Sequence, residues 1–238
     1  MSSQRTTHRR LLSSAAGFTG LTFFSRILGL VREQVRGYYL GTGTGSDAFG
    51  LAATIPNLFR RLFAEGAMTA AFVPVFTGYV TGEDRGEMRR FLSAFVTLFA
   101  VFLAGFTAVM ILVSPWLIRT FFPGFGEVSG KLALTITLTQ LMFPYLFLVS
   151  LAAVAQAVLN SFRIFAPSAA TPILLNLSII GATVACHDWF PDPSYALATG
   201  FLLGGALQLA FQIPWIVKLR LEIRPCFDRS HPGLRELF

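Results

Sequence analysis

Charged residues are scarce in this sequence: Asp, Glu, Lys and Arg make up only 13% of its 238 residues. A soluble domain usually has about a quarter of its residues charged, so that class is excluded. Four stretches contain no charged residue, and each exceeds the roughly 20 residues that cross a hydrocarbon core about 30 Å thick. These stretches are 91–118, 132–162, 164–186 and 193–217. Because the alternating ten-residue segments of a membrane β-barrel are missing, the sequence predicts an all-α polytopic membrane protein.

Two further stretches, 11–40 and 47–80, have a helical pattern but are interrupted by charged residues. The interrupting residues are Arg26, Arg32, Glu33, Arg36, Arg60, Arg61 and Glu65. At 1.5 Å per residue, a straight helix over 47–80 would run about 51 Å, which is too long for one span. We therefore expect a tilted or kinked helix with bends at Pro56 and Pro74. With these two stretches the sequence predicts six transmembrane helices.

Basic residues exceed acidic ones by 19 to 12, which gives a formal net charge of +7. With the N-terminus inside and six spans, twelve basic residues fall on the inner side, three on the outer side and four within spans. This distribution follows the positive-inside rule, so topology explains the charge and nucleic-acid binding is not expected. Residues 1–10 and 218–238 are then both cytoplasmic. The second of these segments ends in HPGLRELF, which is typical of the beginning of a further, truncated seventh helix.

Cysteine and histidine are rare as well. Cys186 and Cys226 are predicted on opposite sides of the membrane, which excludes a disulfide between them. Two acid–histidine pairs occur in loops, but neither has a third ligand at metal spacing, so both are interpreted as solvated loop residues. They are His187 with Asp188 and Asp228 with His231. No nucleophile–base arrangement stands out, so the sequence predicts no enzyme, no metal site and no cofactor.

The intramembrane charges point to a cavity. An arginine at the centre of a lipid-exposed helix costs about 2.5–3.5 kcal/mol, so several of them are expected to face protein or water. Among the six predicted spans, only 11–40 and 47–80 contain charged residues. This predicts that these two helices line the cavity while the four uncharged helices act mostly as scaffold. Only Glu33 and Glu65 offset the arginines, and this surplus favours an anionic ligand, because the planar guanidinium suits phosphate or carboxylate oxygens.

The arginines also have structural interpretations. For Arg36, near the outer end of its span, snorkelling to the interface or internal pairing is favoured. Arg61 and Glu65 are spaced i,i+4, so a structural pair and a binding role both stay open for them. Arg60 points about 100° away from Arg61 on an α-helix, which leaves it available to a ligand. Contact with the ligand is favoured for Arg26, Arg32 and Arg60.

Three segments carry a resemblance to a known family. They are SRILGLVRE (25–33), SDAFGLAATIPNLFRRLFAEGAMTAAFVPVF (46–76) and FPYLFLVSLAAVAQAVLNSFRIFAPSAATPILLN (143–176). Together they resemble the MurJ/MviN family, bacterial lipid II flippases of the multidrug/oligosaccharidyl-lipid/polysaccharide exporter superfamily. The resemblance implies a flippase that moves the undecaprenyl-pyrophosphate-linked peptidoglycan precursor outward across the inner membrane by alternating access. It also implies membrane lipids, and possible cell-wall synthesis proteins, as partners.

The resemblance also implies site residues. Cavity arginines of the family match Arg26, Arg32 and Arg60, and an acidic position matches Asp47. Glu65 falls on the family's glutamate in the second-helix motif, whereas the family often has Asp at the position of Glu33. Glu33, Asp47, Arg61 and Glu65 are accordingly expected to support the charge network around the three arginines.

Family members have about fourteen helices, of which this chain corresponds to the first six-helix lobe and the approach to the seventh helix. We expect a fragment, with a half-size protein that dimerises as the alternative. Other functions compatible with the pattern are export of another lipid-linked glycan, drug or ion antiport, or a non-transporting scaffold for cell-wall synthesis. A carrier of cationic drugs would need an excess of acids in its cavity, and this sequence has an excess of arginine.

Overall fold

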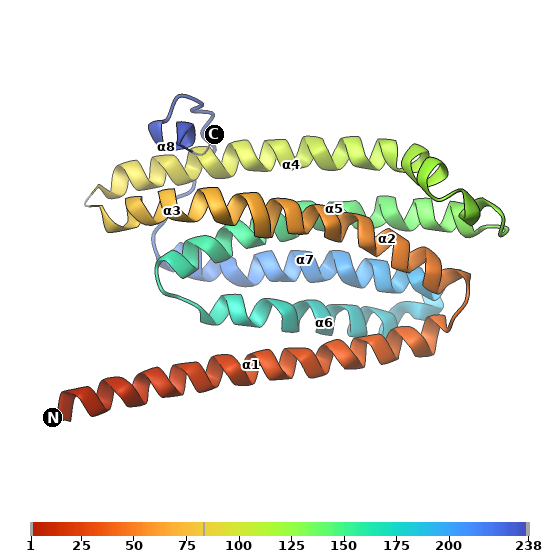
Figure 1. Cartoon of the computed structure of the whole chain (residues 1–238), viewed down its shortest axis with the longest axis horizontal. Helices are drawn as coiled ribbons and strands as arrows, with labels where there is room; N and C mark the ends of the chain where they lie inside the picture. The colour runs from red at the N-terminus through yellow and green to blue at the C-terminus, as the bar shows by residue number, and fades with distance from the viewer. Residues whose placement is uncertain (1, 83, 237–238) are drawn as a thin grey trace.

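The computed structural model describes the backbone of residues 2–82 and 84–236, and the side chains of residues 20–63, 66, 70–82 and 84–236. All regular structure in these residues is helical, which confirms the all-α prediction, and the long helices form an elongated bundle (Figure 1). The helices are α1 (Ser2–Leu40), α2 (Thr44–Arg60), α3 (Met68–Thr81), α4 (Arg85–Phe121), α5 (Lys131–Ser161), α6 (Ala166–Cys186), α7 (Pro193–Lys218) and α8 (Pro232–Arg235). Short 3₁₀ turns follow α4 and α6.

Local sequence explains where several helices begin and end. Asp84 caps α4 by accepting hydrogen bonds from the backbone N–H groups of Gly86 and Glu87, and Asp192 caps α7 by accepting one from Ser194. Such caps satisfy N–H groups that lack a partner within the helix. Gly130 precedes α5 with a φ of +77°, a conformation that glycine adopts without a steric penalty. In the described part of the chain, α4, α5, α6 with its 3₁₀ turn, and α7 are long and apolar enough to cross a membrane.

The helical stretch predicted over 47–80 changes its helix type between the two prolines at which bends were expected. Pro56 lies within α2 and Pro74 within α3, whereas the helix type changes between them, in a π-helical segment at Arg61–Ala67. A proline removes one backbone hydrogen bond at its own position, but a π segment shifts the helical register by an extra residue, and such segments are frequent at functional sites. Side-chain periodicity does not reveal this change of hydrogen-bond pattern.

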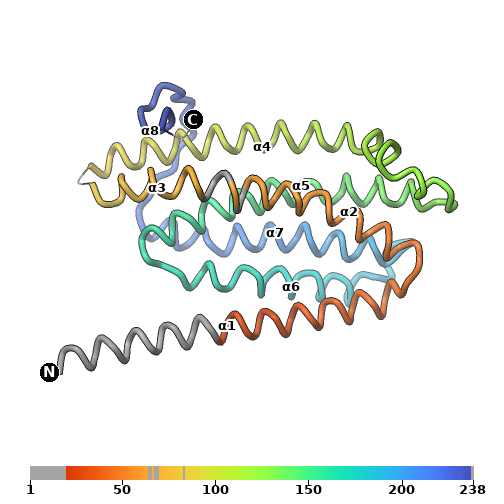
Figure 2. The backbone as a smooth tube through the Cα atoms, in the orientation of Figure 1, coloured from red at the N-terminus to blue at the C-terminus, as the bar shows by residue number. Residues whose placement is uncertain are grey.

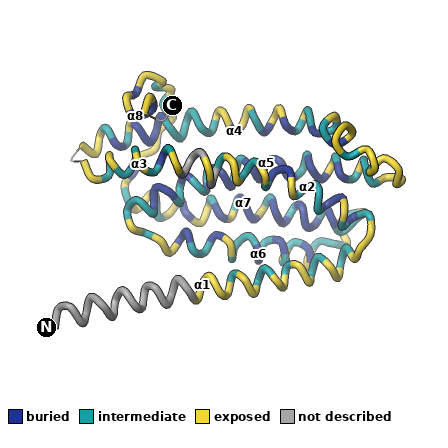
Figure 3. Tube along the Cα trace, in the orientation of Figure 1, coloured by how far each residue is buried: buried dark blue, intermediate teal, exposed yellow. Residues whose placement is uncertain are grey.

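Helix α5 lies at the centre of the packing. It contacts α2, α4 and α7, and α7 in turn packs along α6. Helix α1 packs mainly on α6 and makes few contacts with α2. From the turn that connects them, α1 and α2 diverge along the bundle, as the backbone trace in Figure 2 shows. The described part of α1 is largely exposed, whereas α5 and α7 each have more buried positions than any other helix (Figure 3). This arrangement leaves room between α1 and α2.

The connections fall at two opposite ends of the bundle (Figure 1). The α3–α4 turn, the α5–α6 turn and the segment after α7 lie at the end where α1 begins. The α1–α2 turn and the two 3₁₀ turns lie at the other end. The connections that the sequence assigned to the inner and outer sides of the membrane are therefore separated by the length of the bundle.

The segment after α7 folds back along the beginning of α4. The backbone N–H groups of Arg224 and Cys226 donate hydrogen bonds to the hydroxyl oxygens of Ser93 and Thr97, at 3.2 and 3.0 Å. These side-chain acceptors give partners to backbone that has no regular structure. The segment is thus part of the bundle and not a free tail.

One prediction about this segment is wrong. His231 was interpreted as a solvated loop residue paired with Asp228, but it is 2% exposed, and its Nε2 lies 3.1 Å from Oε1 of Glu87. Asp228 instead lies 3.8 Å from Arg90. The physical reason is the docking of this segment on α4, which brings His231 beside the ring of Phe91. Distance along the sequence does not show such a contact.

Candidate functional site

Two adjoining cavities are lined by residues of α1 and α2 together with residues of α5, α6 and α7. The smaller has a volume of about 440 Å³ and is lined by Glu33, Arg36 and Arg61, among others. We call it the charged cavity. The larger, of about 990 Å³, is lined mainly by neutral polar and apolar side chains of α5, α6 and α7, and we call it the polar cavity. Four residues line both cavities and mark their junction: Arg32, Asn57, Arg60 and Phe201.

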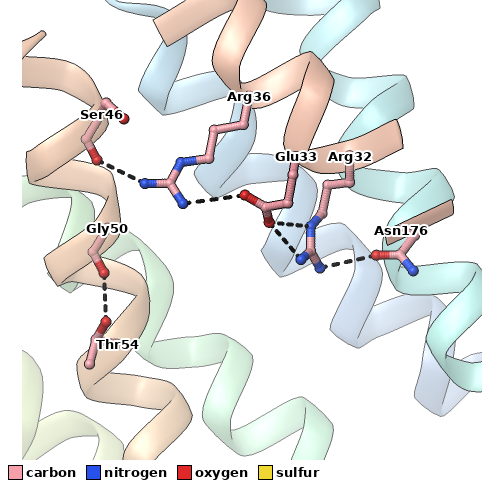
Figure 4. A network of polar contacts seen from close by, with 7 residues as sticks. All are labelled: Arg32, Glu33, Arg36, Ser46, Gly50, Thr54 and Asn176. Carbon is pink, nitrogen blue, oxygen red and sulfur yellow. Dashed lines mark hydrogen bonds and ion pairs between the residues drawn. The ribbon is translucent and has the colours of Figure 1, made fainter. Parts of the chain in front are cut away.

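On the α1 side, a single carboxylate holds two guanidinium groups (Figure 4). Oε1 of Glu33 accepts hydrogen bonds from Arg32 at 2.7 and 3.2 Å, and its Oε2 lies 3.6 Å from Nη1 of Arg36. Charge-assisted contacts of this kind are stronger than neutral hydrogen bonds. Glu33 therefore fixes the position of both arginines on the wall of the charged cavity.

Arg32 also links α1 to α6. Its Nη1 donates to Oδ1 of Asn176 at 3.0 Å, and Nδ2 of Asn176 donates to the backbone oxygen of Ser25 at 3.2 Å. Asn176 is buried within an uncharged helix, so its amide has found both its partners on α1. The guanidinium of Arg32 is therefore held at the junction by two partners, Asn176 on α6 and Glu33 on α1.

Arg36 has a structural environment, which agrees with the expectation of internal pairing. Besides its contact with Glu33, its Nη2 donates to the backbone oxygen of Ser46 at 3.2 Å, and its guanidinium lies 5.4 Å from the ring centroid of Phe49. The ring face attracts a cation. A Cβ on Gly50 would lie 3.2 Å from Nη2 of Arg36, so the glycine permits this close approach. Arg36 thus connects α1 to α2.

On the α2 side, Arg60 and Arg61 face the site from the beginning of the π segment. Nε of Arg60 donates to Oδ1 of Asn57, one turn earlier, at 3.3 Å. Arg61 is exposed and lines the charged cavity. The pair that the sequence suggested between Arg61 and Glu65 lies outside the described side chains, because Glu65 is not among them.

Two of the residues predicted for the site lie elsewhere in this structure. Arg26 is exposed and lines neither cavity. It precedes Arg32 by six residues, which is about 9 Å along a helix axis. Asp47 lies near the other end of α1, where its Oδ2 accepts from Nζ of Lys131 at 2.6 Å, and this ammonium lies 4.5 Å from the ring centroid of Phe125. Asp47 therefore joins the start of α2 to the start of α5.

The described lining of both cavities carries an excess of positive charge. Glu33 is its only acidic residue, against the arginines Arg32, Arg36, Arg60, Arg61 and Arg163. Because Glu33 is shared by two of these arginines, the described lining holds more cations than acids, next to apolar walls. A low-dielectric surrounding strengthens their attraction for an anion. The arrangement is suited to bind phosphate or carboxylate groups.

Reasoning from charge missed the neutral lining residues. Gln156 and Asn160 on α5 and Gln208 on α7 line the polar cavity, although both helices were expected to act mostly as scaffold. A signal was present in the sequence: amides are costly in an otherwise apolar span, and positions 156 and 160 share one face of a helix. Which face meets a cavity depends on the packing of α5 against its neighbours.

Known proteins resemble the chain over most of its length. A family model described as lipid II flippase MurJ matches residues 37–238. A probable lipid II flippase MurJ of Treponema pallidum is 40% identical over 212 residues, which are 87% of this chain and 39% of that protein. One of Vibrio cholerae is 35% identical over 236 residues, which are 96% of this chain and 45% of that protein.

A solved structure shows the same fold. It is described as lipid II flippase MurJ, inward closed conformation, and it matches with a TM-score of 0.74 and 27% identity. The match covers 93% of this chain and 46% of the solved one. The chain therefore spans less than half the length of the curated relatives and of the solved structure that it matches.

Proposed function

The chain belongs to the MurJ family of lipid II flippases, and on this premise we propose that it forms one lobe of a transporter for lipid II. The transporter moves this lipid-linked peptidoglycan precursor from the inner to the outer leaflet of the bacterial inner membrane. The observation that carries the proposal is the junction of the two cavities, where Arg32 and Arg60 line both. The pyrophosphate of the substrate occupies this junction, and its polyprenyl tail stays in the lipid.

Alternating access supplies the translocation step: this lobe rocks against a second one, and the junction opens to each side in turn. The arginines offset the loss of hydration when the pyrophosphate enters the membrane interior. For Arg26, six residues before Arg32 on α1, we propose contact with the substrate in another conformation of this cycle. Drug or cation antiport is disfavoured, because the described lining of the cavities has a single acid, Glu33.

The test of the proposed function is replacement of a resident flippase. The protein, expressed from its own gene in cells depleted of their lipid II flippase, should restore growth and the cleavage of lipid II by an enzyme added outside the cells. Normal membrane insertion without any restored cleavage would contradict the proposal. Restored growth without cleavage of lipid II at the outer face would favour the scaffold function instead.

We also propose that both termini of the described bundle, residues 1–10 and 218–238, face the cytoplasm. The native cysteines test this orientation: Cys186 ends α6 and Cys226 lies in the segment after α7, and these two places are at opposite ends of the bundle (Figure 1). Both cysteines are partly exposed. A membrane-impermeant maleimide applied to intact cells should label the Cys226→Ser variant, through Cys186, and leave the Cys186→Ser variant unlabelled until the membrane is opened. The reverse pattern of labelling would invert the proposed orientation.

A further inference from the structure

The polar cavity has a chemistry of its own. Its described lining contains no acidic residue, and its cations lie towards its ends, Arg32 and Arg60 at the junction and Arg163 in the α5–α6 turn. Between them the wall combines amides and hydroxyls with apolar side chains, which range from alanines to Tyr145 and Leu175. A volume of about 990 Å³ is at the upper end of the roughly 300–1,000 Å³ typical of small-molecule sites.

Several amide groups on this wall have unused hydrogen-bonding capacity within the described residues. Nε2 of Gln208 donates to the backbone oxygen of Thr171 at 2.8 Å, but its Oε1 accepts no hydrogen bond although the residue is only 6% exposed. A buried polar atom without a partner costs about 1–3 kcal/mol. A ligand would recover that energy by donating to this oxygen after a rotation of the amide that turns it into the cavity.

The amides of α5 add donors on the same wall. Oδ1 of Asn160 accepts from the hydroxyl of Ser168 at 2.9 Å, which orients the amide and leaves its Nδ2 to donate elsewhere. Gln156, one turn earlier, makes no hydrogen bond to the rest of the described chain. Because residues four apart share a helix face, the two amides face one ligand group.

The chemistry of the wall selects among the parts of the proposed substrate. The tail is excluded, because an apolar chain would leave the amides without partners. Carboxylates of the peptide would be drawn to the arginines, and a peptide ammonium would find no acid in the described lining. Carbohydrate hydroxyl and acetamido groups are uncharged and both donate and accept, which matches a wall of amides.

We propose that the polar cavity is the carbohydrate subsite, in which Gln156, Asn160 and Gln208 bind the sugars of the precursor while Arg32 and Arg60 hold its pyrophosphate. This inference rests on the proposed function and adds a division of the substrate between the two cavities. The sugar next to the pyrophosphate lies on the α5–α7 side of the junction. The charged cavity is left to the phosphate groups.

The test compares two ligands that differ in the sugars and the attached peptide. Binding of lipid II and of undecaprenyl pyrophosphate, which lacks them, is measured on the purified protein in lipid nanodiscs, for Gln156→Leu and Asn160→Leu. Leucine has a similar volume to these residues and removes the hydrogen bonds. Each variant should bind lipid II about tenfold more weakly, the effect of one hydrogen bond. Its affinity for undecaprenyl pyrophosphate should not change, which also shows that the variant is folded.

Two controls separate the outcomes. Gln140→Leu removes an amide of the same helix that donates to the backbone oxygen of Ile111 and lines neither cavity, so the affinity for both ligands should stay unchanged. Arg60→Ala should weaken both ligands. If the α5 variants bind lipid II normally, or lose both ligands equally, the carbohydrate subsite is refuted. If the unmodified protein binds neither ligand, the proposed function itself fails.

Discussion

Replacing Arg60 or Arg32 by alanine is expected to reduce the outward movement of lipid II by at least tenfold. Each arginine lines both cavities, so each loss removes a cation from the proposed position of the pyrophosphate. A hydrogen bond to a charged group contributes about 1.5–3 kcal/mol, and every 1.4 kcal/mol is a factor of ten. Cleavage of lipid II by an enzyme added outside the cells measures the effect.

The matched control is Arg119→Ala. Arg119 is exposed near the end of α4 and lines neither cavity, so its loss should leave cleavage of lipid II unchanged. Arg60→Lys should have an intermediate effect, because lysine keeps the charge but loses the planar fork that matches phosphate oxygens. Normal transport by either alanine variant, at normal protein levels, would show that the junction does not hold the anion.

The two alanine variants should differ in stability. Arg32 contacts Glu33 and Asn176, so its loss leaves a buried amide on α6 without its donor. Arg60 contacts Asn57 on its own helix among its described partners. A lower thermal midpoint is therefore expected for Arg32→Ala, in addition to the loss of transport. If the two variants lose the same affinity for lipid II despite different thermal midpoints, both arginines contact the ligand.

Gly200→Ala is expected to destabilise the bundle more than other glycine substitutions in the apolar helices. A Cβ at this position would lie 2.7 Å from Cα of Ile179, and 3.1 Å from Cβ of Ala182 and from the backbone oxygen of Ser178. Backbone atoms cannot rotate away as a side chain can, so α6 and α7 must move apart. Overpacking of this kind costs about 1–3 kcal/mol in the free energy of unfolding.

Gly181→Ala is the matched control, because a Cβ at this position on α6 would meet nothing within 4 Å. In a helix interior alanine is favoured over glycine by about 0.5–1 kcal/mol, so this variant should be neutral or slightly stabilised. The thermal midpoint of the purified protein in detergent measures both variants. Equal midpoints for Gly200→Ala and the unmodified protein would show that α6 and α7 are not held at the close approach described.

The Gly200 variant should also weaken transport. Helix α6 carries Asn176, which holds Arg32, and α7 carries Phe201 and Gln208 on the cavity walls. Separating these helices displaces both walls of the polar cavity without changing any residue that lines it.

Local patterns in the sequence were sufficient for several conclusions. The uncharged stretch 132–162 predicted the helix observed at Lys131–Ser161, and 193–217 predicted the one at Pro193–Lys218. The cost of a charge in lipid predicted a cavity lined by arginines, and of the arginines within the two charged stretches all but Arg26 line one. The segments 25–33, 46–76 and 143–176 carried the resemblance to the family. All of these depend on residues that are close to one another in the chain.

The tertiary structure decided which charges meet. Helical spacing places Arg26 and Glu33 on one face, yet Glu33 binds Arg32 and Arg36 instead. Asp47, expected in the charge network, pairs with Lys131, 84 positions away. Long side chains can reach partners off their own face, and helix packing determines which partners from other helices lie within reach.

The cavity walls were decided in the same way. Hydropathy identifies α5 and α7 as membrane helices but does not show which of their faces packs against a neighbour and which one borders an open space. The amides of Gln156, Asn160 and Gln208 border the polar cavity because α1 lies on α6 and apart from α2. This packing makes them candidate ligand-binding residues. The sequence by itself determined the helices and the excess of arginine, because these follow from composition and local spacing, and three of its segments carried the resemblance to the family. The arrangement of the helices determined the site, because a cavity exists only between elements that are distant in the chain.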